Sequence, residues 1–165
     1  MATYSSALTI VGDRVQQTLS NATLNILATL DPSSDVNSYM DVHFSQFYGS
    51  GTVSATLVIQ SWDPINSVWK QVTTFGLENR TVSSSAGTPA PITFGSQNDI
   101  DLYKESGRAL ETFRLQETFA AYNPGVAGSL VPPIRLYAGE RLVTTPSITG
   151  TVGIALNTIK TVPGV

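Results

Sequence analysis

Residues 53–75 read VSATLVIQSWDPINSVWKQVTTF, and this stretch carries the strongest fold signal in the chain. From Val53 to Ser61 every second side chain is apolar, and a similar pattern returns from Val68 to Phe75. Alternation with a period of two among β-branched residues is typical of a half-buried β-strand. Between the two runs, residues 63–67 contain Asp, Pro and Asn, which favour a turn. The stretch therefore predicts two strands joined as a hairpin.

The same alternation appears on both sides of this hairpin and predicts further strands. The runs cover residues 23–30, 40–47 and 151–157, with the apolar sets Leu24, Ile26 and Ala28; Met40, Val42 and Phe44; and Val152, Ile154 and Leu156. Turn-forming residues separate the strands at 31–35, 48–51, 137–140 and 146–147. Pro132 and Pro133 are expected at a strand start or an edge, because proline cannot donate to a ladder.

Two stretches are less regular. Residues 83–96 are rich in Ser, Gly, Thr and Pro, which predicts a long surface loop with a short strand at 92–94. Residues 99–122 mix two periods, since some apolar side chains have helical spacing and others alternate. For this stretch we expect a helical turn near Leu102–Ser106 and then a strand over 112–121.

Eight or nine short strands with little helix in 165 residues predict an all-β fold. The best match is an antiparallel β-sandwich of the jelly-roll type. An immunoglobulin-like sandwich is the alternative, although the Cys–Trp–Cys core of many such domains is absent. We expect one domain over residues 1–165, with short arms at 1–7 and 161–165.

The composition excludes several classes of protein. Charged residues make up 13% of the chain, about half the usual share, and the net charge is −3. No cluster of Lys or Arg could neutralise a phosphate backbone, so no nucleic-acid partner is expected. With no cysteine, disulfides and thiolate metal sites are impossible. No apolar run reaches the ~20 residues that span a bilayer, and no signal peptide is evident, so we expect a soluble protein made in a cytosol-like compartment.

Candidate catalytic and metal-binding groups are few. His43 is the only histidine, and we expect it to point outward from a strand beside Asp41 rather than to form a catalytic triad. Asp99 and Asp101 lie in an oxygen-rich group without the spacing of a calcium loop, which favours a polar loop or helix cap. We therefore predict no enzyme activity, no cofactor and no metal.

The aromatic residues suggest a binding role instead. Trp62 and Trp69 flank the predicted hairpin turn, and three interpretations are open. Trp69 could lie in the core while Trp62 covers a sheet end, the pair could stack on a sugar ring, or it could anchor a protein contact. With Tyr4 and Tyr137, the two tryptophans are the interface candidates.

Residues 53–75, together with 134–137 and 147–156, resemble the hairpin and closing strand pair of tailed-bacteriophage virion proteins. The family that this resemblance implies is the β-sandwich capsid decoration, or cement, proteins. It implies a homotrimer in the virion, assembled in the host cytoplasm, that binds the major capsid protein or other virion proteins and stabilises an icosahedral shell. The alternatives are a carbohydrate-binding module and a tail, neck or fibre component.

Overall fold

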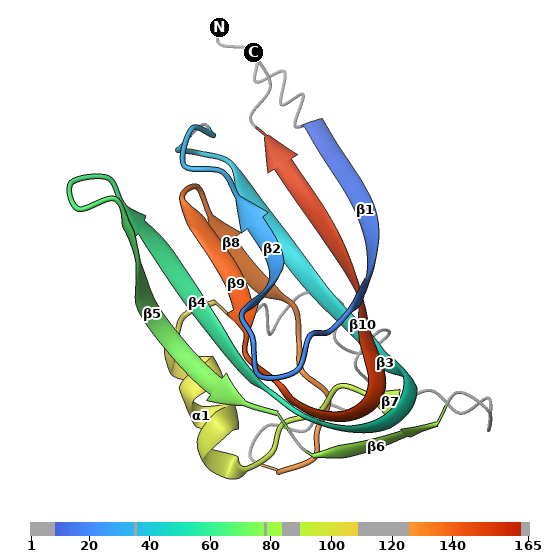
Figure 1. The fold of residues 1–165 in the computed structure, drawn as a ribbon. Coiled ribbons are helices and arrows are strands. Elements are labelled where there is room, and N and C mark those ends of the chain that lie inside the picture. The colour runs from blue at the N-terminus through green and yellow to red at the C-terminus, as the bar shows by residue number, and fades with distance from the viewer. Residues whose placement is uncertain (1–8, 35, 78, 84–89, 109–125, 163–165) are drawn as a thin grey trace, which may run out of the picture.

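The computed structural model describes residues 9–34, 36–77, 79–83, 90–108 and 126–162, which form two packed antiparallel sheets and one helix (Figure 1). The strands and helix, in chain order, are β1 Thr9–Thr18, β2 Asn25–Leu30, β3 Tyr39–Ser54, β4 Thr56–Asp63, β5 Val68–Gly76, β6 Arg80–Ser83, β7 Ala90–Pro91, α1 Gln97–Glu105, β8 Ile134–Tyr137, β9 Glu140–Thr144 and β10 Ser147–Val162. The predicted strand at 112–121 and arm at 1–7 lie outside the described residues, and residues 161 and 162 end β10.

The strand order identifies the type of sandwich. Sheet A runs β1-β10-β3, and β3 also pairs with β6, β7 and β8 along its length. Sheet B runs β2-β9-β4-β5. Strands β1 to β4 alternate between the two sheets. Of the later strands, β10 inserts between β1 and β3, β9 inserts between β2 and β4, and β8 pairs with β3. This interleaving is the connectivity of a jelly roll, as predicted.

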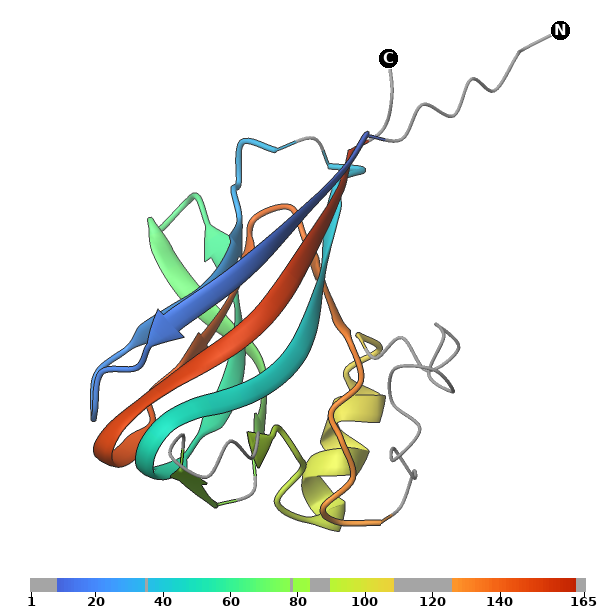
Figure 2. The same ribbon diagram turned by 90° about the vertical axis from the view of Figure 1, so that its right-hand side faces the viewer.

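The two ends of the sandwich carry different elements (Figures 1 and 2). At one end lie the β2–β3 connection, the β4–β5 turn and the β8–β9 turn, together with the start of β1 and the end of β10. We call this the loop end. Helix α1, the β3–β4 corner and the β9–β10 turn lie at the opposite end, which we call the helix end.

Apolar side chains between the sheets form one continuous core. The predicted apolar sets of β3 and β10 are confirmed, because Val42, Phe44, Val152, Ile154 and Leu156 are all buried. They pack with fully buried residues from sheet B and β8, namely Leu57, Ile59, Leu142, Ile134 and Leu136.

Strand β2 departs from its predicted pattern. Leu24 and Ile26 are 50% and 46% exposed, whereas Asn25 and Leu27 are buried. The register with β9 shifts after Ile26, so Ala28 is buried too. Asn25 tolerates burial because its amide makes three hydrogen bonds of 2.8–3.0 Å with the β1–β2 connection. Hydrophobic side chains are therefore left on the outside of sheet B.

The predicted turn at residues 48–51 is wrong, because these residues lie within the 16-residue strand β3. The glycines there serve a different purpose. Gly49 and Gly51 have φ of +105° and +145°, and Gly150, opposite Gly51 on β10, has φ of +80°. Strands β3 and β10 curve together in this region (Figure 2). The glycines permit this close pairing, since a side chain would not fit.

The alternation from Val53 to Ser61 suggested a single strand, but the structure divides this run between two strands. Residues 53 and 54 end β3 in sheet A, and β4 begins at Thr56 in sheet B. Buried Ala55 forms the corner between them. The alternation continues through the corner because Val53, Ala55 and Leu57 all face the same core.

Helix α1 is longer than the turn predicted at 102–106. Ser96 caps it by accepting a hydrogen bond from the backbone of Asp99 (3.2 Å). The Asp99 carboxylate in turn accepts one from the backbone of Gly76 on β5 (2.7 Å). Asp99 and Asp101 thus lie within the helix, with Ser96 as its cap and Asp99 in its first turn, instead of in a polar loop. Residues 92–94, predicted as a short strand, form two isolated bridges beyond β7.

One turn residue offers a stability test. Ser67, after the β4–β5 turn, has φ of +54°, which costs an L-residue about 1–2 kcal/mol. We expect Ser67→Gly to raise the free energy of unfolding by about 0.5–1 kcal/mol, after allowance for the entropy of glycine. Ser34→Gly, in the β2–β3 connection where φ is negative, should lower it. Urea titration measures both, and a loss of stability in Ser67→Gly would contradict the strain at this position.

Candidate protein interface on sheet B and the loop end

The only histidine of the chain lies in sheet A. His43 lies on β3 opposite Asn157 and is half-buried, not fully outward as expected. The Asp41 carboxylate accepts two hydrogen bonds from the Arg135 guanidinium, at 2.8 and 3.1 Å, so both of its oxygens are paired with Arg135. Among the described residues, no group of three His, Cys, Asp or Glu is placed to hold a metal ion.

Burial lowers the pKa of His43 below its ordinary value of 6.5, and the nearby Asp41 charge opposes this effect. The unfolded chain therefore takes up a proton at a higher pH than the folded protein does. The stabilisation is complete above pH 6.5 and is lost as the pH falls through the folded-state pKa. We expect the free energy of unfolding to fall as the pH drops below about 6.5, and to fall less in His43→Gln. Urea midpoints at several pH values measure this, and equal slopes would contradict it.

Trp62 and Trp69 face each other across the β4–β5 hairpin. Their rings form a T-shaped pair, with centroids 5.3 Å apart and planes at 60°. Because Leu57 and Ile59 point into the core, Trp62 lies on the outer face of sheet B, and its cross-strand partner lies there too. Both rings are partly exposed, so the interpretation that placed Trp69 in the core is wrong.

Arg141, on the neighbouring strand β9, reaches this aromatic pair. Its guanidinium carbon lies 4.2 Å from the centroid of the Trp69 ring, and its Nε donates to Gln60 on β4 (2.8 Å). Partial burial lowers the pKa of Arg141. The cluster thus extends across three strands of sheet B.

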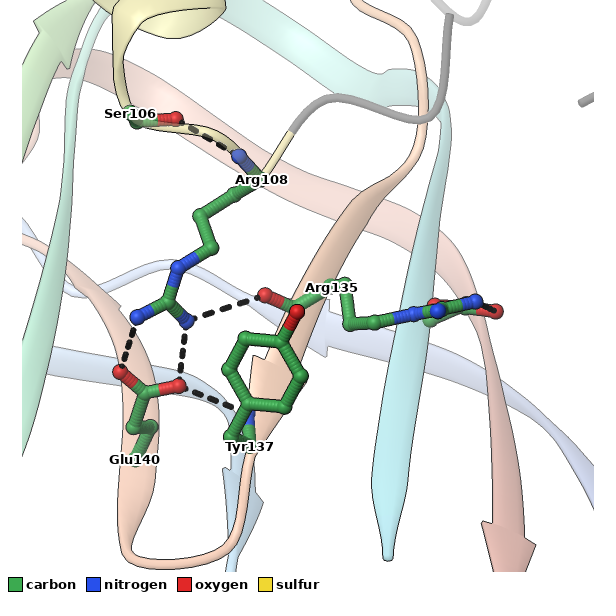
Figure 3. Close-up of polar contacts among 6 residues, drawn as sticks. Ser106, Arg108, Arg135, Tyr137 and Glu140 are labelled. Atoms are coloured by element: carbon green, nitrogen blue, oxygen red, sulfur yellow. Dashed lines mark hydrogen bonds and ion pairs between the residues drawn. The ribbon is translucent and has the colours of Figure 1, made fainter. Parts of the chain in front are cut away.

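Tyr137 ends β8 at the loop end and is 43% exposed. Figure 3 shows its surroundings. Arg108 forms a bidentate ion pair with Glu140, one bond of which measures 2.8 Å, and Glu140 also accepts from the Tyr137 backbone (2.7 Å). The Arg108 guanidinium lies 4.6 Å from the Tyr137 ring centroid. This network holds the β8–β9 turn and the Tyr137 ring in place.

A similar arrangement lies on the adjacent strand pair. Arg135, bound to Asp41, lies 3.9 Å from the centroid of the Tyr39 ring. The hydrogen bonds with Asp41 raise the pKa of Arg135. No local sequence pattern reveals these ion pairs, because their members are 32 and 94 residues apart.

The structure brings three of the four interface candidates to one region. The backbone of Trp62 donates to Gly139 in the β8–β9 turn (2.8 Å), next to Tyr137. Trp69 lies opposite Trp62. Tyr4, the fourth candidate, lies outside the described residues.

Several exposed hydrophobic side chains belong to sheet B or to its connections. Of the eight large ones among the described residues, five are found there, namely Leu24, Ile26, Ile65, Val68 and Val72. The strands of sheet B carry four charged residues, of which Asp63 pairs with Lys70 and Glu140 with Arg108. An apolar surface with tryptophan and arginine but little free charge is typical of the centre of a protein interface.

No model of a known protein family matches the chain, and no curated protein or solved structure matches it. No helix in the described part of the chain is long and apolar enough to cross a membrane.

Proposed function

We propose that this protein is a structural component of a virion, a head decoration protein that binds the outside of an icosahedral bacteriophage shell and stabilises it. One observation carries the proposal: a jelly roll whose sheet B presents exposed hydrophobic side chains and a Trp–Trp–Arg cluster with little free charge. Jelly rolls recur in viral capsid and lectin domains. The resemblance of residues 53–75 to phage virion hairpins supports the viral interpretation.

The proposed mechanism is adhesion across several shell subunits. Burial of exposed residues such as Ile65, which is 90% exposed, would contribute about 25 cal/mol per Å² of apolar surface. A homotrimer would multiply such contacts, because after the first subunit binds the others are held at a high effective concentration. Weak individual sites would then give long residence on the shell.

A sugar-binding module is less well supported. Stacking on a pyranose requires an open, flat ring face. Arg141 covers one face of the Trp69 ring, and the two indoles meet at 60° rather than forming a flat platform. A tail, neck or fibre protein would use the same adhesive surface, and the experiment below separates these roles by the particle that is bound.

The test measures occupancy on purified capsids, together with the mass of the free protein by light scattering. We expect a trimer that saturates the shells. Ile65→Asp, at the tip of the β4–β5 turn, should lower affinity about tenfold or more without unfolding the domain, because the side chain makes few contacts of its own. Val126→Asp is the matched control, since Val126 is 49% exposed but lies outside sheet B and its turns.

A monomer that ignores shells would overturn the proposal. Binding to purified tails instead of heads would show that the protein is a tail component and not a head decoration protein. Retention on a glycan array that is lost in Trp62→Ala would favour the sugar-binding module.

A further inference from the structure

Three arginines at the loop end and on sheet B stack on aromatic rings, but one of them differs in its partners. Arg108 and Arg135 each form a bidentate pair with a carboxylate, Glu140 and Asp41 respectively. Arg141 has no carboxylate partner anywhere in the part of the chain that the structure describes. Its one hydrogen bond runs to the neutral amide of Gln60.

The position of Arg141 fixes what its guanidinium can still do. The Nε–H is used by Gln60, while the terminal N–H groups have no acceptor among the described residues. These donors lie in one plane and can donate two parallel hydrogen bonds to the two oxygens of a carboxylate. Stacking on Trp69 limits the motion of the guanidinium, so little freedom is lost when a partner binds.

Apolar side chains border these donors on both sides along the outer face of sheet B. Register places Arg141 opposite Gln60, and the next row of the sheet runs through Ile26, Val143 and Val58 to Thr74. In this row Ile26 is exposed and Val58 half-buried, whereas Val143 is buried beneath its neighbours. On the other side lies the Trp62–Trp69 pair. A carboxylate bound to Arg141 would therefore have hydrophobic surface on either side of it.

We propose that the outer face of sheet B binds a protein segment in which an Asp or Glu is flanked by apolar side chains, with the carboxylate held by Arg141. The occupant is a segment of another virion protein, and for that identity the inference rests on the proposed function. Charge complementarity argues for the carboxylate, because an uncompensated, partly desolvated cation on an apolar face gains most from an anionic partner. A phosphate is less suitable, since Lys70, the other cation on the strands of sheet B, alternates with Trp69 along β5 and is paired with Asp63.

The contact chemistry can be tested without any capsid. Hexanoate, which combines a carboxylate with an alkyl chain, is titrated into ¹⁵N-labelled protein while the Trp62 and Trp69 indole N–H and Arg141 Nε–H signals are followed by NMR. Hexanamide, of the same shape without the charge, is the ligand control. We expect saturable shifts at these three side chains with hexanoate, and about tenfold weaker binding of hexanamide, which corresponds to about 1.4 kcal/mol.

Three variants make the result specific. Arg141→Gln should bind hexanoate about tenfold more weakly, and Arg141→Lys should restore part of the affinity, since it keeps the charge but loses the two parallel donors. Arg14→Gln removes an exposed arginine from β1 of sheet A and should bind as the parent protein does. Equal binding of the two ligands, shifts confined to other residues, or unchanged binding in Arg141→Gln would each overturn the proposal.

The capsid assay then separates this inference from the proposed function. Reduced occupancy of Arg141→Gln on shells that the parent protein saturates would support both. If the parent protein saturates shells and Arg141→Gln does so equally, the function stands and the assigned surface is wrong. If the parent protein ignores shells but hexanoate binds at Arg141, the function is wrong. A dimer that disappears in Arg141→Gln would show that the occupant is a second copy, against the proposal.

Discussion

Gly51→Ala is expected to remove most of the folded population, with a loss of more than about 4 kcal/mol in the free energy of unfolding. Gly51 has φ of +145°, a conformation that residues with a side chain rarely adopt. A Cβ at this position would overlap the carbonyl oxygen of Thr149 and lie 2.8 Å from its carbonyl carbon. Both atoms belong to the β10 backbone, so relief requires the β3–β10 ladder to open. Circular dichroism and urea titration measure the loss.

Gly107→Ala is the matched control for this prediction. Gly107 also has positive φ, at +68°, but a Cβ there meets no heavy atom within 4 Å. We expect Gly107→Ala to lower the free energy of unfolding by only about 1–2 kcal/mol, because the only cost is that of the backbone conformation. A similar loss in both variants would show that close approach of the strands does not require glycine at position 51.

Glu140→Ala is expected to cost about 3–5 kcal/mol, because it leaves the Arg108 guanidinium buried without its counter-charge. The side chains of Arg108 and Glu140 are only 16% and 7% exposed. The backbone N–H of Tyr137 loses its acceptor in the same variant. Thermal and urea unfolding measure the change, and a loss below about 1 kcal/mol would contradict a buried, structurally important pair.

A second variant distinguishes a buried charge from a favourable pair. Arg108→Met combined with Glu140→Leu removes both charges and should recover much of the stability lost in Glu140→Ala. Lys70→Met, which breaks the exposed Lys70–Asp63 pair, should change stability little, since Lys70 is 62% exposed. If the double variant is less stable than Glu140→Ala, the charges themselves stabilise the loop end.

The strands and the sandwich could be predicted because alternation is a local property of the sequence. Val42 and Phe44, like Val152 and Ile154, face the core as their spacing implies. The hairpin turn at 63–67 was predicted for a similar reason, since Asp63 accepts hydrogen bonds from the backbone of Ile65 at 2.9 Å and Asn66 at 3.3 Å.

Features that depend on distant partners could not be predicted in this way. Glycines within residues 48–51 indicated a turn, but their role depends on how closely β10 approaches β3. Trp69 was ambiguous because either face of β5 could have met the core. The arginine–carboxylate pairs connect residues that only the fold brings together. That Arg141 has no carboxylate partner within the described residues can likewise be seen only from the fold.

The place of β10 in sheet A has a consequence for how the chain is made. Strand β10 lies between β1 and β3, and Thr9 at the start of β1 pairs with Val162 at the end of β10. On a ribosome, the centre of this sheet is therefore synthesised after the strands on either side of it, and β1 cannot pair until β10 has been made. Such non-local pairing makes folding slow, on the order of milliseconds to seconds. Until β10 is made, β1 and β3 lack the strand that lies between them, and unpaired strand edges of this kind favour aggregation.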